Sequence, residues 1–146
     1  MPEGERVSRP LAFPIRIPFV EQVGFELWRF ENGQAELRLA LDPMHLNALS
    51  TAHGGVLMTM LDVVMAHAAR SAVAPQPEQG QSLATIEMKT SFLRPAQREL
   101  RAHGQLIHRT KSLAFCEGRV VDAAGELCAH ATGTFRLLRA ATARAG

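Results

Sequence analysis

Asn47-Ala-Leu-Ser-Thr-Ala-His-Gly-Gly-Val-Leu-Met-Thr-Met-Leu-Asp62 is the segment around which this chain is expected to fold. It consists of a polar loop, a pair of glycines and the start of an apolar segment that predicts a helix over roughly Gly54–Val73. Because apolar residues occupy nearly every side of this helix, we expect it to be buried. Asp62 interrupts the apolar segment at its middle. A carboxylate is costly to bury unless it is partnered or faces a wet cavity, so Asp62 is either a hydrogen-bonded structural group or a working group in a cleft.

Length and composition are those of one globular domain. The 146 residues are 47% hydrophobic and 21% charged, which allows a sizeable core. The formal net charge of +2 is too small, and the basic residues are too scattered, to indicate nucleic acid as a partner. The amino terminus lacks the pattern of a secretory signal, and no apolar run approaches the ~20 residues of a membrane span. We therefore expect a cytoplasmic protein with no membrane partner.

The two cysteines, Cys116 and Cys128, do not make a disulfide framework. A hairpin turn at residues 122–125 would place Cys116 opposite roughly Ala131 and Cys128 opposite roughly Arg119, out of register for a bridge. Both are expected to be reduced thiols that pack in the core.

The domain is expected to cover residues 19–139. A flexible, Pro- and Arg-rich arm at 1–18 would precede it, and a frayed tail at 140–146 would follow it. A helical turn at 19–23 leads into a hairpin, in which residues before and after the Asn32-Gly33 turn pair as two strands.

Four further strands are predicted after the long helix, connected as a meander: 83–93, 99–108, 113–122 and 126–138. In the first of them, strict alternation places Met88 on one face of the sheet and Thr85 on the other. Short links favour an antiparallel sheet, and one helix can cover one face of it. The predicted class is therefore α+β, with five to six antiparallel strands and one long helix. This chain alone does not easily enclose the far side of that helix, so we expect a second subunit to do so.

The loop and the helix resemble those of the hotdog-fold thioesterases, specifically the PaaI-like (phenylacetate-pathway type) acyl-CoA thioesterases. The resemblance rests on Asn47, on His53-Gly54-Gly55, on Asp62 at the family spacing and on the strand Thr85-Ile-Glu-Met-Lys-Thr-Ser-Phe-Leu-Arg-Pro95. It covers roughly residues 18 to 138, with Ser50 standing where many relatives carry Gly. The resemblance implies a hotdog fold, in which the sheet wraps around the central helix. It also implies hydrolysis of an acyl-CoA thioester to a carboxylic acid and CoA, with no cofactor beyond the CoA of the substrate.

Thioester hydrolysis needs one group that polarises the carbonyl and another that activates water. The backbone amide of Gly54 at the helix start is suited to polarise the carbonyl, although a glycine pair also serves a tight turn. Asp62 would act as general base or as nucleophile. The two residues are eight positions apart on one helix, roughly 12 Å at 1.5 Å per residue, so they cannot contact the same carbonyl. If both are catalytic, Gly54 of one subunit meets Asp62 of another in a dimer. The resemblance implies the same arrangement, and such dimers could pair into tetramers.

Several other residues have both a functional and a structural interpretation. By resemblance, Asn47 would donate its amide to the thioester carbonyl, or it caps its own loop. Thr85 would hold the water, where some relatives carry a Ser, or it is an ordinary strand residue. His53 orients the loop or lines the site and is not expected to be the base, and Gly55 shares the opening at the helix start. The phosphates of CoA would need cations at strand ends, or these cations form a solvated rim: Arg94, Arg109 and Lys111.

Two other functions stay open. A hotdog dehydratase or hydratase could use His53 with Asp62, and a non-catalytic protein could bind acyl-CoA without turnover. The six histidines show no paired zinc-ligand spacing, so no metal is expected. The sequence does not determine whether the acyl group is aromatic, medium-chain or long-chain.

Overall fold

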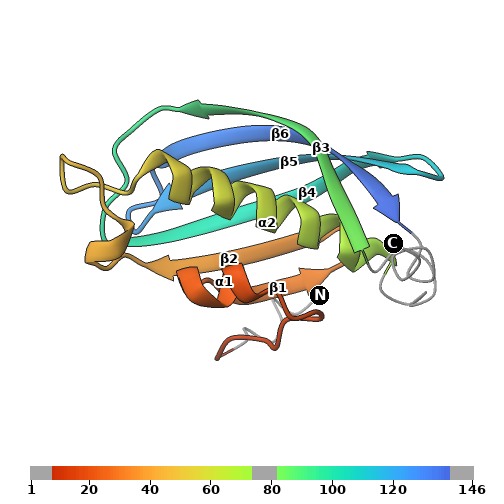
Figure 1. Ribbon diagram of the computed structural model, residues 1–146, viewed down its shortest axis with the longest axis horizontal. Coiled ribbons are helices and arrows are strands. Elements are labelled where there is room, and N and C mark those ends of the chain that lie inside the picture. The colour runs from red at the N-terminus through yellow and green to blue at the C-terminus, as the bar shows by residue number, and fades with distance from the viewer. Residues whose placement is uncertain (1–7, 74–81, 139–146) are drawn as a thin grey trace.

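The computed structural model describes residues 8–73 and 82–138. Figure 1 shows one long helix lying across a curved sheet. The elements in chain order are α1 (Pro18–Val23), β1 (Glu26–Glu31), β2 (Gln34–Ala40), the short 3-10 helix η1 (Pro43–His45), α2 (Gly54–Val73), β3 (Ser82–Phe92), β4 (Glu99–Arg109), β5 (Leu113–Asp122) and β6 (Leu127–Leu138).

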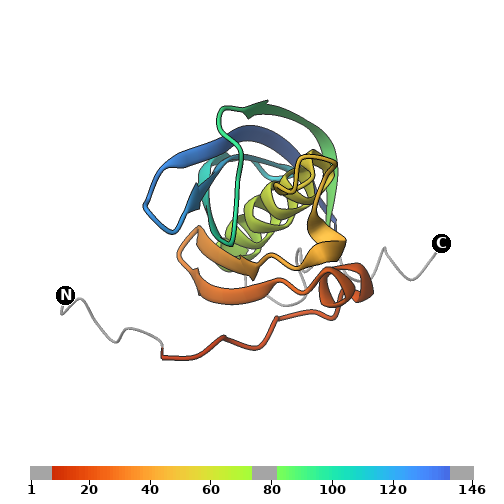
Figure 2. The same ribbon diagram turned by 90° about the vertical axis from the view of Figure 1, so that its left-hand side faces the viewer.

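The six strands form one antiparallel sheet in the order β1-β2-β4-β5-β6-β3. The sheet curls around α2, which Figure 2 shows nearly end-on. This confirms the predicted fold class, an antiparallel sheet wrapped around one long central helix. The predicted four-strand meander is wrong, because β3 pairs with β6 and not with β4. Because α2 crosses the sheet, the chain after α2 joins the sheet at its far edge as β3. The next strand, β4, then pairs with β2.

Helix α2 is bound closely to the concave face of the sheet. Its core-facing residues include Leu57, Leu61, Val64 and Ala68, each at most 3% exposed. Gly104 on β4 permits this approach, because a Cβ at that position would overlap the carbonyl oxygen of Val64. The helix has the length and composition of a membrane span, with 20 residues and a mean hydropathy of 1.4, contrary to the expectation that no such run exists. Most of that segment is buried inside the domain, as in a core helix.

The β1–β2 hairpin turns at Asn32 and Gly33, as predicted, and both have positive φ angles, of 47° and 80°. Ser71 near the end of α2 fixes this turn, because its Oγ accepts a 2.8 Å hydrogen bond from the Gly33 amide. The same hydroxyl donates to the Ala68 carbonyl at 2.7 Å.

A β-bulge in β3 changes which residues of that strand face the helix. The register with β6 shifts between Thr85 and Glu87, so Ile86 is the extra residue. Thr85 and Met88 consequently both line the pocket beside α2. The prediction that they lie on opposite faces is therefore wrong.

Both cysteines are free and buried, in keeping with thiols that pack in the core. Their surroundings differ in register from the prediction, because Cys116 faces Gly133 and not Ala131. Burial raises the pKa of the Cys116 thiol to about 12.

Part of the predicted N-terminal arm is in contact with the domain. The Leu11 amide donates to the Leu27 carbonyl at 2.7 Å, and Leu11, Phe13 and Ile17 pack against the core. Residues 1–7 and the predicted tail at 140–146 lie outside the described residues. The boundaries of the domain at 19 and 139 stay predictions.

Candidate active site

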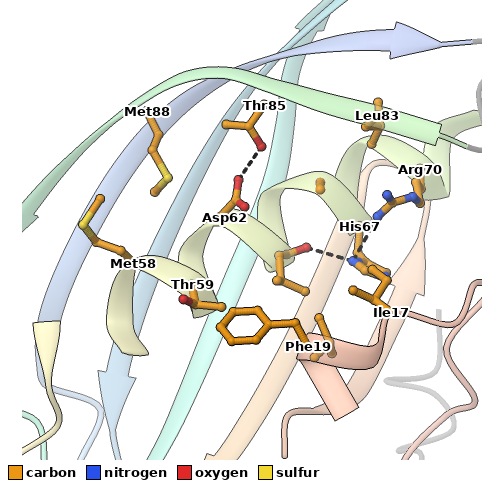
Figure 3. Close-up of a pocket in the computed structure, with 13 residues that line it drawn as sticks. Ile17, Phe19, Met58, Thr59, Asp62, His67, Arg70, Leu83, Thr85 and Met88 are labelled. Carbon is orange, nitrogen blue, oxygen red and sulfur yellow. Dashed lines mark hydrogen bonds between the residues drawn. The ribbon is translucent and has the colours of Figure 1, made fainter. Parts of the chain in front are cut away.

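A pocket of about 390 Å³ lies along the side of α2 that the sheet leaves uncovered. Figure 3 shows its three walls, which are α2, strand β3 and the short helix α1 with the residue before it. We call it the acid pocket because Asp62 is the one acidic residue among the described residues that line it. It is lined by Ile17, Phe19, Val20, Met58, Thr59, Asp62, Val63, Ala66, His67, Arg70, Leu83, Thr85 and Met88.

The Asp62 carboxylate is held by a hydrogen bond from the opposite wall. The Thr85 hydroxyl donates to Asp62 Oδ1 at 2.7 Å (Figure 3). The bulge at Ile86 supports this pair, because it turns Thr85 toward the helix together with Met88. One carboxylate oxygen is thus engaged by Thr85, while the group as a whole remains partly exposed to the pocket. The arrangement suits a carboxylate that takes a proton from water.

Toward the C-terminal end of α2, the acid pocket contains two residues that were not singled out from the sequence. Arg70 is 8% exposed and His67 is fully buried. Arg70 lies on the same stripe of α2 as Asp62, with Ala66 between them at helical spacing of four residues. That spacing was the available signal, but an arginine in the last turn of a helix is also the ordinary complement of the helix dipole.

His67 is neutral at physiological pH. Burial, followed by the nearby Arg70 charge, lowers the pKa of His67 from 6.5 to about 4. Its Nδ1 lies 2.9 Å from the Val63 carbonyl oxygen and 3.3 Å from Arg70 Nη1. We assign the proton to Nδ1, donated to Val63, because that contact is shorter and the carbonyl can only accept. Among the described residues, Nε2 has no hydrogen-bond partner, and the edges of Phe13 and Phe30 lie against the ring.

A second pocket, of about 340 Å³, lies at the N-terminal end of α2. We call it the amide pocket because Gly54 at the helix start is one of its walls. It is lined by Asn47, Thr51, Ala52, Gly54, Leu57, Phe92, Leu93, Arg94, Pro95 and Ala96.

Asn47 holds the loop that leads into the helix. Its Oδ1 accepts from the amides of Leu49 and Thr51 at 2.9 and 3.1 Å, and its Nδ2 donates to Thr51 Oγ1 at 2.9 Å. A longer bond of 3.4 Å runs from Nδ2 to the Ala52 carbonyl. The structural interpretation of Asn47 is therefore realised. Its side chain is committed to the loop, although it lines the same pocket as Gly54.

The backbone amides of Gly54 and Gly55 at the helix start differ in their hydrogen bonding, and His53 is the cause. His53 Nδ1 accepts from the Gly55 amide at 2.9 Å, so the imidazole orients the loop. Within residues 8–73 and 82–138, the Gly54 amide donates no hydrogen bond. The ring of Phe92 lies beside Gly54, 3.6 Å from where a Cβ would be. The Gly54 amide is thus the donor at this helix end that is left for a carbonyl oxygen.

The three predicted cations do not come together in one chain. Arg94 lines the amide pocket and makes a 3.3 Å ion pair with Glu126. Arg109 and Lys111 are exposed and lie where β4 turns into β5, at the opposite end of the sheet. No contact in the described part of the chain distinguishes Arg109 and Lys111 from a solvated rim.

The predicted catalytic residues are thus split between two pockets. Asp62 and Thr85 line the acid pocket, whereas Gly54 and Asn47 line the amide pocket. This agrees with the expected separation of roughly 12 Å along the helix, and one chain does not bring all four residues to a single carbonyl.

Comparison with known proteins places the fold. A family model described as "Thioesterase superfamily" matches residues 49–129, more than half of the chain. The Halobacterium salinarum protein named "Putative esterase VNG_1336C" is 33% identical over 93 residues, 60% of each chain. The chain therefore spans about 60% of the length of the curated relative that it matches.

Two solved structures resemble the whole domain. The E. coli PaaI protein from the phenylacetic acid degradation operon gives a TM-score of 0.73 at 21% identity, covering 82% of this chain and 83% of PaaI. The Streptococcus mutans protein smu.793, solved with acetyl-CoA bound, gives 0.75 at 20% identity, covering 88% of this chain and 96% of that one. At these identities the likeness concerns the fold. The chain belongs to the Thioesterase superfamily, and its hotdog fold is that of the PaaI proteins, as the resemblance of the loop and helix predicted.

Proposed function

We propose that this protein hydrolyses an acyl-CoA thioester to a free carboxylic acid and CoA. The observation that carries the proposal is the Asp62 carboxylate, held by Thr85 at 2.7 Å inside a largely apolar pocket on the open side of α2. Membership of the Thioesterase superfamily supports the reaction class. The S. mutans neighbour solved with acetyl-CoA supports CoA as the leaving group.

In the proposed mechanism, Asp62 removes a proton from water while the water oxygen attacks the thioester carbonyl. Thr85 donates to Oδ1, which leaves Oδ2 of the same carboxylate to accept that proton. The carbonyl oxygen becomes negatively charged and is stabilised by a backbone amide at a helix start, a contribution of about 3 kcal/mol per donor in known cases. The C–S bond then breaks, and the CoA thiolate leaves and is protonated. Direct attack by Asp62 on the carbonyl would give an anhydride instead, which water then opens.

The amide would come from Gly54 of a second subunit. Within one chain, Gly54 opens into the amide pocket and Asp62 into the acid pocket. Antiparallel packing of two α2 helices about a two-fold axis would bring each Gly54 opposite the partner's Asp62 and form two equivalent sites. Two such dimers could pair further into a tetramer. CoA enters as part of the substrate, and the proposed chemistry needs no separate cofactor.

The proposal is tested with purified protein and a panel of acyl-CoAs of graded length, including an aromatic one, with a thiol reagent to detect released CoA. Turnover of at least one acyl-CoA is expected. Appearance of a double bond in a hydroxyacyl-CoA without release of thiol would instead indicate a dehydratase. Tight binding of acyl-CoA with no turnover would indicate a non-catalytic binder.

A further inference from the structure

The α1 wall of the acid pocket is a short helix that depends on neighbouring segments for its position. It has six residues, Pro18–Val23, and no side-chain hydrogen bond caps its N-terminus. A helix this short is not stable alone in water, because its few hydrogen bonds do not offset the cost of nucleation. Phe19 and Val20 of α1 line the pocket. The shape of the pocket therefore depends on what holds α1 in place.

The side chain of His45 is bonded to the C-terminal end of α1. Its Nε2 lies 2.7 Å from the carbonyl oxygen of Val23, the last residue of the helix. Carbonyls in the last turn of a helix have no partner within the helix, so the imidazole supplies one from outside. His45 is 2% exposed and lies 22 residues further along the chain. This bond ties α1 to the loop that leads into α2.

The other ring nitrogen of His45 and its backbone hold that loop. The Asp42 amide donates to Nδ1 at 3.0 Å, which closes a capping box at η1. The His45 carbonyl accepts from the amide of His53 at 2.8 Å. His53 directly precedes Gly54 in the sequence. One residue is therefore bonded both to the helix that walls the acid pocket and to the segment that presents the Gly54 amide.

These partners assign the tautomer of His45. A backbone amide can only donate and a backbone carbonyl can only accept, so Nδ1 carries no proton and Nε2 carries one. Asp42 Oδ1 lies 3.4 Å from Nδ1, but it accepts a shorter bond, of 2.9 Å, from the Met44 amide. Both nitrogens of this buried imidazole are thus hydrogen bonded to backbone groups.

We infer that His45 is a positioning residue for both halves of the proposed active site. Its Nε2–H holds the α1 wall, against which the acyl group would pack, and its Nδ1 holds the loop that presents the Gly54 amide. The inference rests on the proposed function and adds to it a residue that lines neither pocket. In the proposed dimer, the acid pocket and the Gly54 amide of one subunit serve different sites. His45 of each subunit would therefore support both of them.

Two substitutions separate the two bonds, because each keeps one partner of the ring. The short amide of His45→Asn reaches the position of Nδ1, where its oxygen can accept from the Asp42 amide, but it ends before the Val23 carbonyl. The longer His45→Gln can donate to Val23 and leaves the Asp42 amide without its acceptor. Each variant is assayed with acyl-CoAs of graded length. Titration calorimetry with a non-hydrolysable thioether analogue of the best substrate gives the fraction of competent sites.

The two variants should fail in different ways. In His45→Asn, the ratio of kcat/KM between the best and the poorest acyl-CoA that the wild type hydrolyses should fall about tenfold, as for loss of one hydrogen bond. Its kcat per competent site should stay near the wild-type value, because the loop is still held. His45→Gln should lower kcat per competent site about tenfold for every acyl-CoA and keep the wild-type ratios, because α1 is still held.

His108→Asn and His108→Gln are the matched controls, since His108 is an exposed histidine on β4 outside both pockets. They should leave kcat and the ratios as in the wild type. The tautomer gives a test that needs no variant, because nitrogen NMR shifts of the His45 ring in the wild type distinguish a proton on Nε2 from one on Nδ1. A proton on Nε2 is expected. A proton on Nδ1 would overturn the inference even if both His45 variants fail to fold.

Equal effects of the two His45 variants on kcat and on the ratios would overturn the inference. So would wild-type values of both quantities per competent site, because His45 would then serve folding alone. The proposed function would still stand in either case, since the wild type hydrolyses acyl-CoA. If the wild type hydrolyses no acyl-CoA, the proposed function itself fails, and the role of His45 in it falls too.

Discussion

The two pockets along α2 offer chemically different groups. The polar groups of the acid pocket are side chains, with Asp62 held by Thr85 and with Arg70 toward the C-terminal end of α2. In the amide pocket the candidate group is the backbone N–H of Gly54, and Asn47 together with the neighbouring His53 holds the loop that presents it. Under the proposed function, the acid pocket would therefore activate water and the amide pocket would bind the oxyanion, and neither alone would do both.

This difference gives the proposed dimer a chemical reason. Among the described residues, those lining the acid pocket include no free helix-start amide, and those lining the amide pocket include no carboxylate. A two-fold pairing that puts one against the other would complete both at once.

Replacing Asp62 by Asn should remove the proton acceptor of the acid pocket and keep its shape. We expect kcat/KM for the best acyl-CoA to fall about a thousandfold, the middle of the range for a general base. Rates of CoA release measure the loss, and calorimetric titration with the same acyl-CoA checks that binding persists. A fall of less than about tenfold would remove Asp62 from the chemistry.

In the amide pocket, Gly54→Pro deletes the N–H and adds the pyrrolidine ring, which is well tolerated at the first position of a helix. We expect kcat to fall about a hundredfold or more, as for loss of one oxyanion donor. Gly54→Ala is the control: it keeps the N–H, and its Cβ would stand 3.6 Å from the Phe92 ring, an ordinary contact. Equal losses in the two variants would mean that space, and not the amide, is what the site needs.

Because His67 is buried in the acid pocket, the free energy of unfolding should fall at acidic pH. The pKa of His67 is 6.5 when unfolded and about 4 when folded, so below pH 6.5 the unfolded chain takes up a proton that the folded chain refuses. This favours unfolding as the pH falls from about 6.5 to 4, by roughly 3 kcal/mol in all. Urea unfolding of wild type and His67→Gln at pH 7 and pH 4.5 measures it. Parallel losses of stability in the two proteins would show that other groups cause the acid sensitivity.

Thr85→Val tests how much the acid pocket depends on the bond to Asp62, since it removes the Thr85 hydroxyl and keeps the shape of the residue. We expect kcat to fall about tenfold, the value of one hydrogen bond to a charged group. Thr85→Ser keeps the hydroxyl and should retain most of the activity. If the serine variant is as slow as the valine variant, the methyl group of Thr85 matters and the hydrogen bond does not.

Features that depend on local side-chain periodicity and turn geometry were predicted correctly from the sequence. Periodic apolar residues located α2, and Asn32-Gly33 located the hairpin turn. The separation of Asp62 from Gly54 followed from helix geometry alone. The neighbour of β3 could not be deduced in the same way, because alternation identifies a strand but not the strand that it pairs with.

The geometry of the candidate site was less predictable, because it depends on contacts that form only in the folded chain. The bulge at Ile86, which turns Thr85 toward Asp62, contains no glycine or proline that would have indicated it in the sequence. Asn47 was assigned to the correct pocket, but its commitment to the loop depends on contacts with Thr51 that form only in the folded turn. Arg70 and His67 were missed because the residues beside them, such as Phe13, Phe30 and Ile17, come next to them only in the fold.

Mixing two inactive variants tests the shared site most directly. Subunits carrying Asp62→Asn are refolded or co-expressed with an equal amount of subunits carrying Gly54→Pro, and CoA release is measured. Random pairing makes half of the dimers mixed, and each mixed dimer has one site with an intact acid and an intact amide. Activity should therefore return to roughly a quarter of the wild-type value. Activity that stays at the level of the two separate variants, in a sample shown to contain mixed dimers, would contradict a site shared between subunits.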